Sequence, residues 1–501
     1  MAHQPAANNK QWQWAGLALF LLLCYFPLFL HLDTLSLRLW DESRRGVSAI
    51  EMAEGGSWLT PTFEGQPDLY GTKPPLLIWL QATFMKVLGY NELAVRLPSA
   101  LAGLATVLLL VWFSRRHLQR PLAGYLAGLI LLTSKGYINY HGAISGDYDA
   151  LLILWLTAYS LCFYLLIERQ EWRYLYLTAL FILLAGWTKG VAGLFFIPAL
   201  GLYALWRGRL WWLLKQPRLY LCMAGALIGI LAYYGLREQL NPGYIAAVLE
   251  NEVGGRYLRT QEGMARPFWF YFRVVHQYER FYPWEFFLPL GILVGLWSKP
   301  LRPVAGLILM ISVFFLLLIS LGQTKHEWYY LPALPLLSLL IGLGLEQAII
   351  RPVLEQAASW KSYAFLLVFI IALFGAPYTE IINKVYAFRH EGWNSEQTVY
   401  RDFMRRVDRY KAYTILHPSY NGHIAFYKKI FNLKGYNIGQ QLLHAPEPRV
   451  QIVAAGPPDF APGTIVMVCE EEARQALEEK SVLEVLEEWE ACRLVRVAGR
   501  R

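Results

Sequence analysis

Residues 303–321 read PVAGLILMISVFFLLLISL, a run of 19 residues without a charged side chain. A helix of this length spans roughly 30 Å, the thickness of the hydrocarbon core of a bilayer. Of the 501 residues, 17% are charged and 56% are hydrophobic. Ordinary soluble enzymes contain about a quarter charged residues. The composition therefore excludes that class and predicts an α-helical polytopic membrane protein.

Similar apolar runs recur along the chain and predict about 11 transmembrane helices. We place them at residues 13–31, 97–113, 121–138, 149–167, 174–188, 191–206, 218–236, 286–298, 303–321, 329–347 and 362–378. The first run lacks a small-residue cleavage site followed by a soluble body, which indicates a retained helix rather than a signal peptide.

The short connections between these runs differ in charge. One alternating set carries 14 cations, whereas the short connections on the other side carry only Lys189 and Lys325. Because cations concentrate on the cytoplasmic side, this asymmetry predicts a cytoplasmic N-terminus. An odd number of spans then places the C-terminus on the external face. The cations of the first set are Lys10, Arg115, Arg116, Arg120, Arg169, Arg173, Arg207, Arg209, Lys215, Arg218, Lys299, Arg302, Arg351 and Lys361.

Three longer segments fall on the predicted external face. We assign loops 32–96 and 237–285 to a transmembrane module, 1–378, and the polar segment 379–501 to a small α/β accessory domain. The first loop contains an amphipathic stretch, KPPLLIWLQATFMKVLG, that predicts an external helix. In the accessory domain, AYTILHP, RVQIVAAG, TIVMVCE and RLVRVAG predict strands, and TVYRDFMRRVDRY and EEARQALEEKS predict helices. Of the five cysteines, Cys469 and Cys492 are the two expected to pair.

Two acidic pairs lie in successive external segments at the predicted membrane surface. Asp41 and Glu42 follow the first span, and Asp147 and Asp149 precede the fourth. Either pair alone is explained most simply by a helix N-terminus, where negative charge is favoured. However, carboxylates near hydrocarbon are costly and usually functional. Because bundled spans can bring both pairs to one place, we predict that these four residues are catalytic.

The external face also holds cations on the side where the positive-inside rule depletes them. A single cation there simply extends to the lipid headgroups, and tyrosines at that depth commonly anchor the interface. Together these residues indicate a bound anion, for which a membrane-anchored phosphate is the natural choice. The predicted phosphate-binding residues are Lys73, Arg256, Arg259, Lys325, His326, Tyr329 and Tyr330.

The sequence contains no Walker lysine and no glycine-rich nucleotide motif. A sugar on a polyprenyl phosphate needs neither, because its anomeric bond is already activated. Cations such as Lys73 and Lys325 would stabilise the departing phosphate, and Asp41 is the candidate base for an acceptor hydroxyl. Two other classes remain as alternatives. A flippase for lipid-linked saccharides should place its polar residues near the bilayer midplane, and a membrane sensor or scaffold would use the accessory domain as its working part.

Several motifs, in order, resemble the C-type membrane glycosyltransferases. LWDESRRGVSAIEMAEGGSWLTP, YGTKPPLLIWLQ and VRLPSALAGLATVLLLVWF are similar to the opening of these proteins, SGDYDALLILW to their second acidic motif and HEWYYLPALPLLSLL to a late span. The resemblance covers about residues 30 to 350 and is strongest to the bacterial branch of the lipid A aminoarabinose transferase and the protein O-mannosyltransferases. It implies an inverting transfer of a sugar from undecaprenyl phosphate to a periplasmic acceptor, with the protein in the bacterial inner membrane.

Carried over by position, the resemblance makes Asp41 the essential first-loop carboxylate, Asp147 or Asp149 the second acidic position and Lys73 the lysine on the lipid phosphate. One departure is Thr72, which stands where the aminoarabinose transferases commonly have a glutamate that helps to hold a metal. The resemblance thus implies no firmly bound metal, with a divalent ion on His276 or His326 as an alternative, and it argues against aminoarabinose as the sugar. The acceptor is lipid A, another envelope glycan or a protein, and no nucleic acid is expected as a partner.

Overall fold

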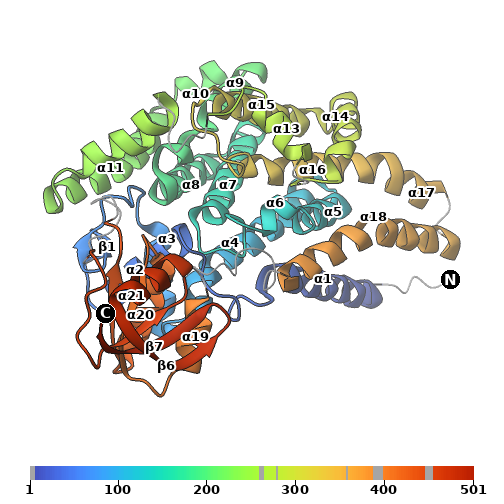
Figure 1. The fold of residues 1–501 in the computed structure, drawn as a ribbon. Helices are drawn as coiled ribbons and strands as arrows, with labels where there is room; N and C mark the ends of the chain where they lie inside the picture. Colours follow the sequence, from blue (N-terminus) through green and yellow to red (C-terminus); the bar gives the residue numbers. More distant parts are fainter. Residues whose placement is uncertain (1–5, 259–264, 278–279, 357–358, 388–398, 446–454) are drawn as a thin grey trace. The chain divides into compact units, whose positions relative to one another are not determined.

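The computed structural model describes residues 6–258, 265–277, 280–356, 359–387, 399–445 and 455–501 and is mostly helical (Figure 1). Its contacts divide the chain into two compact units. Unit 1 comprises Met1–Leu30, Ser99–Gly235 and Val248–Tyr386, and unit 2 comprises His31–Pro98, Leu236–Ala247 and Ala387–Arg501. This division differs from the predicted boundary at residue 378, because the first external loop shares its contacts with the C-terminal segment.

Unit 1 is an assembly of helices. Its α-helices are α1 (Ala6–Phe29), α4 (Glu92–Phe113, which starts in unit 2), α5 (Pro121–Leu132), α6 (Lys135–Ile138), α7 (Tyr148–Arg169), α8 (Trp172–Lys189), α9 (Ile197–Trp206), α10 (Leu210–Leu214), α11 (Pro217–Leu240, which ends in unit 2), α13 (Phe270–Gln277), α14 (Leu288–Trp297), α15 (Arg302–Leu321), α16 (Leu334–Leu345), α17 (Arg351–Gln356) and α18 (Trp360–Ala387). Short 3-10 or π turns join them: η1 (Ser114–Leu118), η2 (Gly190–Leu194), η3 (Leu249–Leu258), η4 (Trp284–Phe287), η5 (Leu331–Ala333) and η6 (Glu346–Ile350).

Seven helical segments of the described chain are long and apolar enough to cross a membrane, namely Glu92–Leu118, Tyr148–Arg169, Trp172–Leu194, Pro217–Leu240, Arg302–Leu321, Leu331–Glu355 and Trp360–Lys384. Each predicted apolar run coincides with helical structure. The run predicted at 121–138 is interrupted, because α5 ends at Leu132 and the Gly136 N–H donates to the Arg280 carbonyl instead of continuing the helix. The protein is therefore a polytopic α-helical membrane protein.

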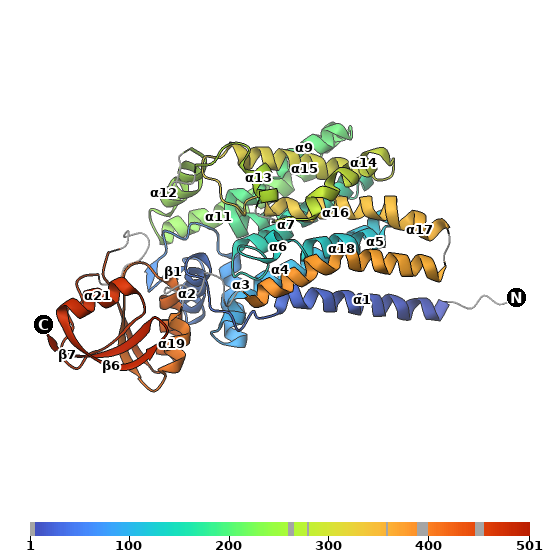
Figure 2. The ribbon, with the colours of Figure 1, turned by 45° about the vertical axis from the view of Figure 1, so that its right-hand side comes forward.

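Small residues and single polar contacts hold the helices of unit 1 together. At the contact of α5 with α16, a side chain at Gly342 would lie 2.5 Å from the Ala123 carbonyl, so only glycine permits this approach. The Glu346 carboxylate accepts the Ala123 N–H at 3.0 Å. Helices α1 and α18 lie side by side (Figure 2), and the Tyr378 hydroxyl donates to the Leu23 carbonyl at 2.8 Å.

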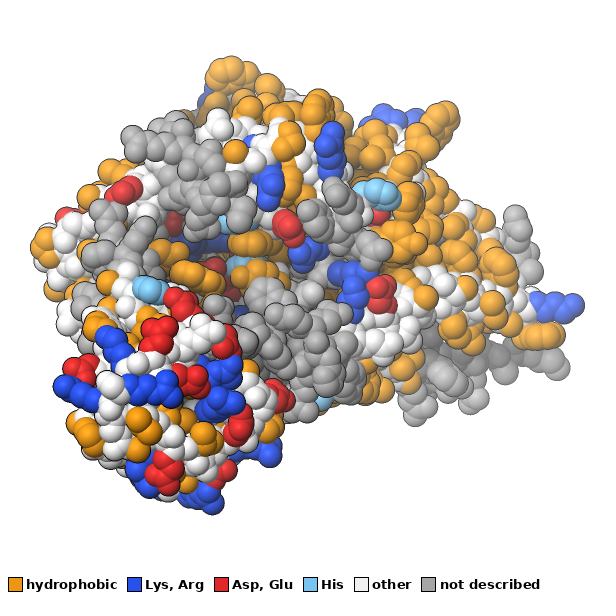
Figure 3. Space-filling view, in the orientation of Figure 1, with side chains coloured by type: hydrophobic (Ala, Val, Ile, Leu, Met, Phe, Trp, Pro, Cys, Tyr) orange, Lys and Arg blue, Asp and Glu red, His pale blue; other side chains and the backbone are white. Residues whose placement is uncertain are grey.

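Unit 2 contains a five-stranded sheet in the order β4-β3-β5-β7-β6. Strand β3 is parallel to both neighbours, whereas β7 is antiparallel to β5 and β6. The strands are β3 (Ala412–His417), β4 (Asn437–Leu442), β5 (Ile465–Val468), β6 (Ser481–Trp489) and β7 (Cys492–Arg500), with helices α19 (Tyr400–Arg406), α20 (Gly422–Leu433) and α21 (Glu471–Lys480). The predicted strand RVQIVAAG lies mainly outside the described residues, and β4, β6 and α20 were not predicted. Charges of both signs are interspersed over this part of the surface (Figure 3).

The first external loop packs into the same core as this sheet. Its elements are helix α2 (Asp41–Ala53), the hairpin of β1 (Thr62–Phe63) and β2 (Gln66–Pro67), and helix α3 (Leu76–Leu88). Unit 2 also contains the short helix α12 (Tyr244–Val248), which follows α11. Apolar residues of α2, such as Ile50, pack in one cluster with Ile424 and Phe426 of α20. The neutral ring of His423 donates from Nδ1 to the Leu37 carbonyl at 2.8 Å. Residues 31–98 and 399–501 therefore share one hydrophobic core.

A disulfide joins Cys469 to Cys492 between the ends of β5 and β7, as the cysteine positions predicted. Cys24, Cys162 and Cys222 are free and lie in helices of unit 1.

Candidate active site

In unit 1, Asp147 is the N-cap residue of α7. Its carboxylate accepts the Tyr148 N–H at 2.6 Å, and its other oxygen contacts Nδ1 of His141. The Ser99 hydroxyl donates to the Asp147 carbonyl at 3.0 Å, so the residue is held from both sides. The simple N-cap interpretation of Asp147 is thus correct as local geometry, and the contact with a buried histidine adds a second titratable group.

Asp149 pairs with a lysine that is 40 residues away in the sequence. Helices α7 and α8 pack together, and the Lys189 Nζ at the end of α8 donates to Asp149 Oδ1 at 2.6 Å. The two side chains are 3% and 10% exposed for Asp149 and Lys189, so the pair is largely removed from solvent. Gly190 adopts φ 56°, which lets the chain turn directly after Lys189.

The second carboxylate oxygen of Asp149 is buried and has no hydrogen-bond partner among the described residues. Asp149 and Lys189 line a cavity of about 70 Å³ together with Tyr329 and Glu252. Leaving a buried acceptor without a hydrogen-bond partner costs on the order of 1–3 kcal/mol, and more when the acceptor is charged. The pair thus places a carboxylate with unused acceptor capacity in the cavity wall.

The late motif contributes aromatic rings to the same end of unit 1. The Lys189 Nζ lies 5.8 Å from the centre of the Tyr329 ring. The Trp328 ring stacks on His141 with ring centres 3.7 Å apart and on His326 at 4.6 Å. Three motifs that are distant in the sequence, around residues 141–149, 189 and 326–329, therefore converge in unit 1.

Other predicted phosphate ligands are placed differently. The Lys325 Nζ donates to the Arg266 carbonyl at 3.0 Å and also to the Gly322 carbonyl, and burial lowers its pKa. Tyr330 is 1% exposed and does not belong to the cavity lining. Arg259 lies outside the described residues, and so does the side chain of Arg256.

The first acidic motif begins α2 in unit 2. Asp41 is 39% exposed at its side chain and pairs with Arg45 at 2.9 Å. Glu42 is 2% exposed and accepts two hydrogen bonds from Arg96, at 2.7 and 3.0 Å, and one from the Arg38 N–H. The two neighbours thus differ, because the Asp41 side chain is partly exposed whereas Glu42 lies within a buried ion pair.

Lys73 is half-buried in a loop whose carbonyls are bound by side chains of α11 and α12. Arg237, which is 0% exposed, donates to the carbonyls of Asp68 at 2.6 Å and Gly71 at 3.3 Å. The Tyr244 hydroxyl donates to the Thr72 carbonyl at 2.7 Å, and the Arg237 guanidinium lies 3.9 Å from the Tyr244 ring centre. We call Arg237 and Tyr244 the loop clamp, since together they bind the carbonyls of Asp68, Gly71 and Thr72, which all precede Lys73.

A buried ion pair holds the same loop from the other side. Arg44 donates to both Asp68 carboxylate oxygens, at 2.8 and 3.1 Å. Burial opposes ionisation of Asp68, but the Arg44 guanidinium, the Gly71 N–H and the charge of Arg237 outweigh it and keep the pKa of Asp68 below its usual value. The Arg44 guanidinium also lies 4.1 Å from the Phe63 ring centre. The backbone before Lys73 is therefore fixed at several points.

Sequence reasoning missed His141, Arg96, Asp68 and Arg237 and did not predict the partner of Lys189. Arg237 and Lys189 had a usable signal, because both are cations on the predicted external face, where the positive-inside rule depletes them. As potential metal ligands, His141 and Asp147 place two donor atoms together in the described part of unit 1. Catalytic zinc sites usually take three ligands from the protein. His276 is exposed and pairs with Glu285 at 3.3 Å.

These features define a class: a multi-span helical membrane protein with acidic, basic and aromatic side chains gathered where its helices end. The family described as dolichyl-phosphate-mannose-protein mannosyltransferase matches residues 72–234. The chain is 31% identical over 343 residues to the undecaprenyl phosphate-alpha-4-amino-4-deoxy-L-arabinose arabinosyl transferase of Aeromonas salmonicida and 28% identical over 342 residues to that of Shewanella sediminis. These alignments cover 66% and 64% of this chain but only 59% of each relative.

The crystal structure of ArnT from Cupriavidus metallidurans bound to undecaprenyl phosphate has the same fold. Its TM-score is 0.75 at 18% sequence identity, with 97% of this chain and 99% of that chain covered. The Archaeoglobus fulgidus oligosaccharyltransferase in the apo form is more distant, with a TM-score of 0.52. Together the matches confirm the resemblance to the C-type membrane glycosyltransferases.

Proposed function

We propose that the protein is an inverting glycosyltransferase that moves a sugar from a polyprenyl phosphate, such as undecaprenyl phosphate, to an acceptor outside the cytoplasm. The observation that carries the proposal is the buried Asp149–Lys189 pair, which lines a cavity together with Tyr329. The names of the relatives and the undecaprenyl phosphate in the C. metallidurans structure support this donor class. No described feature favours a flippase.

The proposed roles follow from exposure and partners. Asp41 is exposed and takes the proton of the acceptor hydroxyl as the acceptor oxygen attacks the anomeric carbon. The bond between that carbon and the phosphate oxygen breaks, and the phosphate leaves with the electron pair. Lys73 neutralises the charge on the departing phosphate. Asp149, oriented by Lys189, accepts a hydrogen bond from a substrate hydroxyl.

Two predicted residues take supporting roles in this proposal. Glu42 holds Arg96 and the start of α2, so it positions Asp41 rather than contacting substrate. The carbonyl bonds of Lys325 fix the start of the late motif. Tyr329 and His326 remain proposed contacts for the donor, because Tyr329 lines the cavity and the His326 ring lies edge-on to it, with ring centres 5.1 Å apart.

We also propose that the chain crosses the bacterial inner membrane 11 times. The seven long segments would be joined by four of the shorter apolar helices, Trp14–Phe29, Pro121–Leu132, Ile197–Trp206 and Trp284–Trp297. The N-terminus is then cytoplasmic, and residues 379–501 form a periplasmic accessory domain. The Cys469–Cys492 disulfide supports this orientation, because disulfides persist in oxidising compartments.

A lipid profile of a deletion strain tests the function. We expect an accumulated polyprenyl-phosphate sugar and an envelope glycoconjugate, lipid or protein that lacks one sugar. Undecaprenyl phosphate aminoarabinose is the first donor to assay with the purified protein, since the relatives carry its name. Unchanged sugar lipids in the deletion strain, together with no transfer from any polyprenyl-phosphate sugar in vitro, would refute the proposal.

A further inference from the structure

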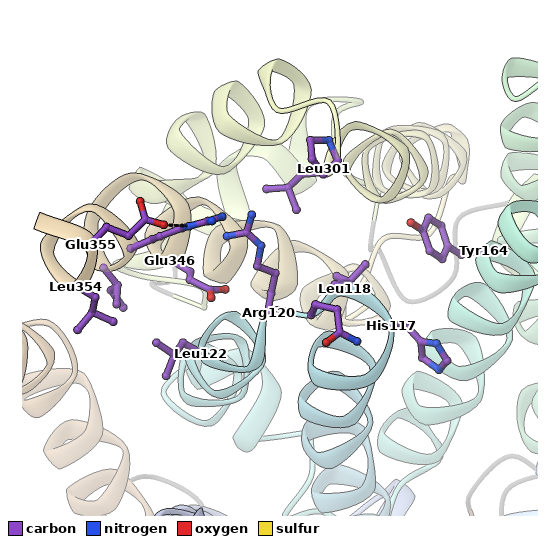
Figure 4. A pocket seen from close by; sticks show the side chains of 13 residues that line it. His117, Leu118, Arg120, Leu122, Tyr164, Leu301, Glu346, Leu354 and Glu355 are labelled. Atoms are coloured by element: carbon purple, nitrogen blue, oxygen red, sulfur yellow. Dashed lines mark hydrogen bonds and ion pairs between the residues drawn. The ribbon is translucent and has the colours of Figure 1, made fainter. Parts of the chain in front are cut away.

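Unit 1 contains a second cavity, of about 640 Å³, which the proposed reaction does not use (Figure 4). It lies where connections that carry the predicted cytoplasmic cations meet, at residues 117–122, 300–301 and 346–355. Its volume is within the range of sites that bind small molecules, about 300–1,000 Å³. The cavity therefore has room for a ligand at the membrane end opposite to the proposed active site.

The polar lining of this cavity contains charges of both signs. Arg120, which precedes α5, and Glu346 of η6 line it, and Arg351 pairs with Glu355 at 2.5 Å. No hydrogen bond or ion pair joins the Arg120 guanidinium to another described residue. The Glu346 carboxylate uses one oxygen for the Ala123 N–H and is 7% exposed. The cavity thus offers a cation and a carboxylate that each have unused hydrogen-bonding capacity.

His117 adds a second unsatisfied polar group. Both of its ring nitrogens are buried, and neither has a hydrogen-bond partner among the described residues. The ring itself packs edge-on against Trp112, with ring centres 4.9 Å apart. Buried ring nitrogens are usually hydrogen-bonded. Neither nitrogen opens into the cavity, so the ring forms part of its wall and does not contact a ligand.

The remaining lining is apolar and includes Leu118, Leu122, Leu301, Ile350 and Leu354. Polar and apolar walls in one cavity fit a lipid, whose headgroup meets charges and whose glycerol and first methylenes meet leucines. An anionic headgroup would gain from Arg120 but meet repulsion from Glu346 and Glu355. A headgroup that carries both charges satisfies both kinds of residue.

We propose that this cavity binds the headgroup of phosphatidylethanolamine from the cytoplasmic leaflet. Arg120 donates to the phosphodiester, and Glu346 accepts hydrogen bonds from the primary ammonium. The side of the membrane follows from the proposed orientation, whereas the headgroup chemistry does not depend on it or on the transferase activity.

Native mass spectrometry of the full chain in nonionic detergent tests the proposal. The probes are phosphatidylethanolamine, phosphatidylcholine and phosphatidylglycerol with identical acyl chains. We expect about ten-fold greater retention of phosphatidylethanolamine, because the quaternary ammonium of phosphatidylcholine donates no hydrogen bond and phosphatidylglycerol has no cation. Arg120→Gln should reduce this retention about ten-fold. Arg116→Gln is the matched control, since Arg116 is exposed in η1, four residues before Arg120, and does not line the cavity.

A second variant gives a result that misfolding does not produce. Glu346→Gln keeps an acceptor for the Ala123 N–H but removes the negative charge, so selectivity should move from phosphatidylethanolamine towards phosphatidylglycerol. Equal retention of the three lipids by the wild-type chain, or an Arg120→Gln variant that behaves like Arg116→Gln, would overturn the proposal. Displacement of the lipid by millimolar O-phosphorylethanolamine would also overturn it, because the ligand would then be a soluble phosphate ester.

Discussion

Replacing Arg237 by Met removes the charged part of the loop clamp while keeping a long apolar side chain. The substitution deletes the 2.6 Å hydrogen bond to the Asp68 carbonyl, the 3.3 Å bond to the Gly71 carbonyl and the cation–π contact with Tyr244. A hydrogen bond from a charged donor contributes about 1.5–3 kcal/mol, and a desolvated cation–π contact about 2 kcal/mol. Removing the buried guanidinium also abolishes its desolvation cost. We therefore expect the variant to lose about 3 kcal/mol of the free energy that holds the loop before Lys73 in place.

The loss should appear first in binding of undecaprenyl phosphate. If the clamp acts by positioning Lys73, Arg237→Met should weaken this binding nearly as much as Lys73→Ala. The double variant should then be no worse than Lys73→Ala alone, because both changes affect one interaction. Titration of the purified variants with undecaprenyl phosphate measures all three affinities.

Tyr244→Phe is a graded control for the clamp. It removes only the 2.7 Å bond to the Thr72 carbonyl, so the expected cost is about 1 kcal/mol. Glu238→Gln should leave affinity unchanged, because Glu238 is half-buried and bonds the backbone N–H groups of residues 243–245, for which the glutamine carbonyl is still an acceptor. Additive effects of Arg237→Met and Lys73→Ala would refute the positioning role, and an unchanged affinity in Arg237→Met would refute the clamp itself.

Three further predictions concern catalysis and pH. Asp41→Asn should abolish transfer to a hydroxyl acceptor and leave undecaprenyl phosphate binding intact; near-normal turnover would exclude Asp41 as the base. Asp149→Asn should lower kcat about 100-fold, and it should also lower the unfolding midpoint because it leaves the buried Lys189 without its counter-ion; transfer rates and thermal unfolding measure both effects, and a wild-type rate would contradict the role of Asp149. His417 and His423 are buried, and desolvation lowers the pKa of each to about 4. The unfolded chain thus binds more protons than the folded chain between pH 6.5 and 4. As the pH falls through this range the free energy of unfolding should decrease, and at pH 5 the decrease should be about 2 kcal/mol per histidine. Unfolding midpoints measured from pH 8 to 4.5 give this pH dependence, which His423→Gln should roughly halve. An unchanged pH dependence in the variant would contradict the role of His423.

The helices of unit 1 could be predicted because their signal is local. An uncharged run such as 303–321 needs only its own length and composition to indicate a span, and α15 occupies it almost residue for residue. The break after Leu132 was missed because it depends on the Arg280 carbonyl, which lies far away in the sequence. Strand β4, NIGQQL, was missed because its polar residues carry no strand pattern and its partner β3 supplies the pairing.

The candidate site shows the same limit. Acidic residues at the ends of spans marked Asp41, Glu42, Asp147 and Asp149, but sequence did not distinguish their surroundings. Glu42 lies in a buried pair with Arg96, 54 residues away, whereas its neighbour Asp41 is exposed. Charge type can be inferred from a motif, but the partner that decides whether a carboxylate is available depends on tertiary contacts.

The shared core of residues 31–98 and 399–501 has a consequence for biosynthesis. The loop emerges early from the ribosome, yet its partner helix α20 is translated more than 300 residues later. Until then Ile50 and its neighbours have no permanent cover, so a chain truncated before residue 399 would present an unfinished loop to proteases. The last hundred residues therefore decide when a segment made near the beginning becomes protected.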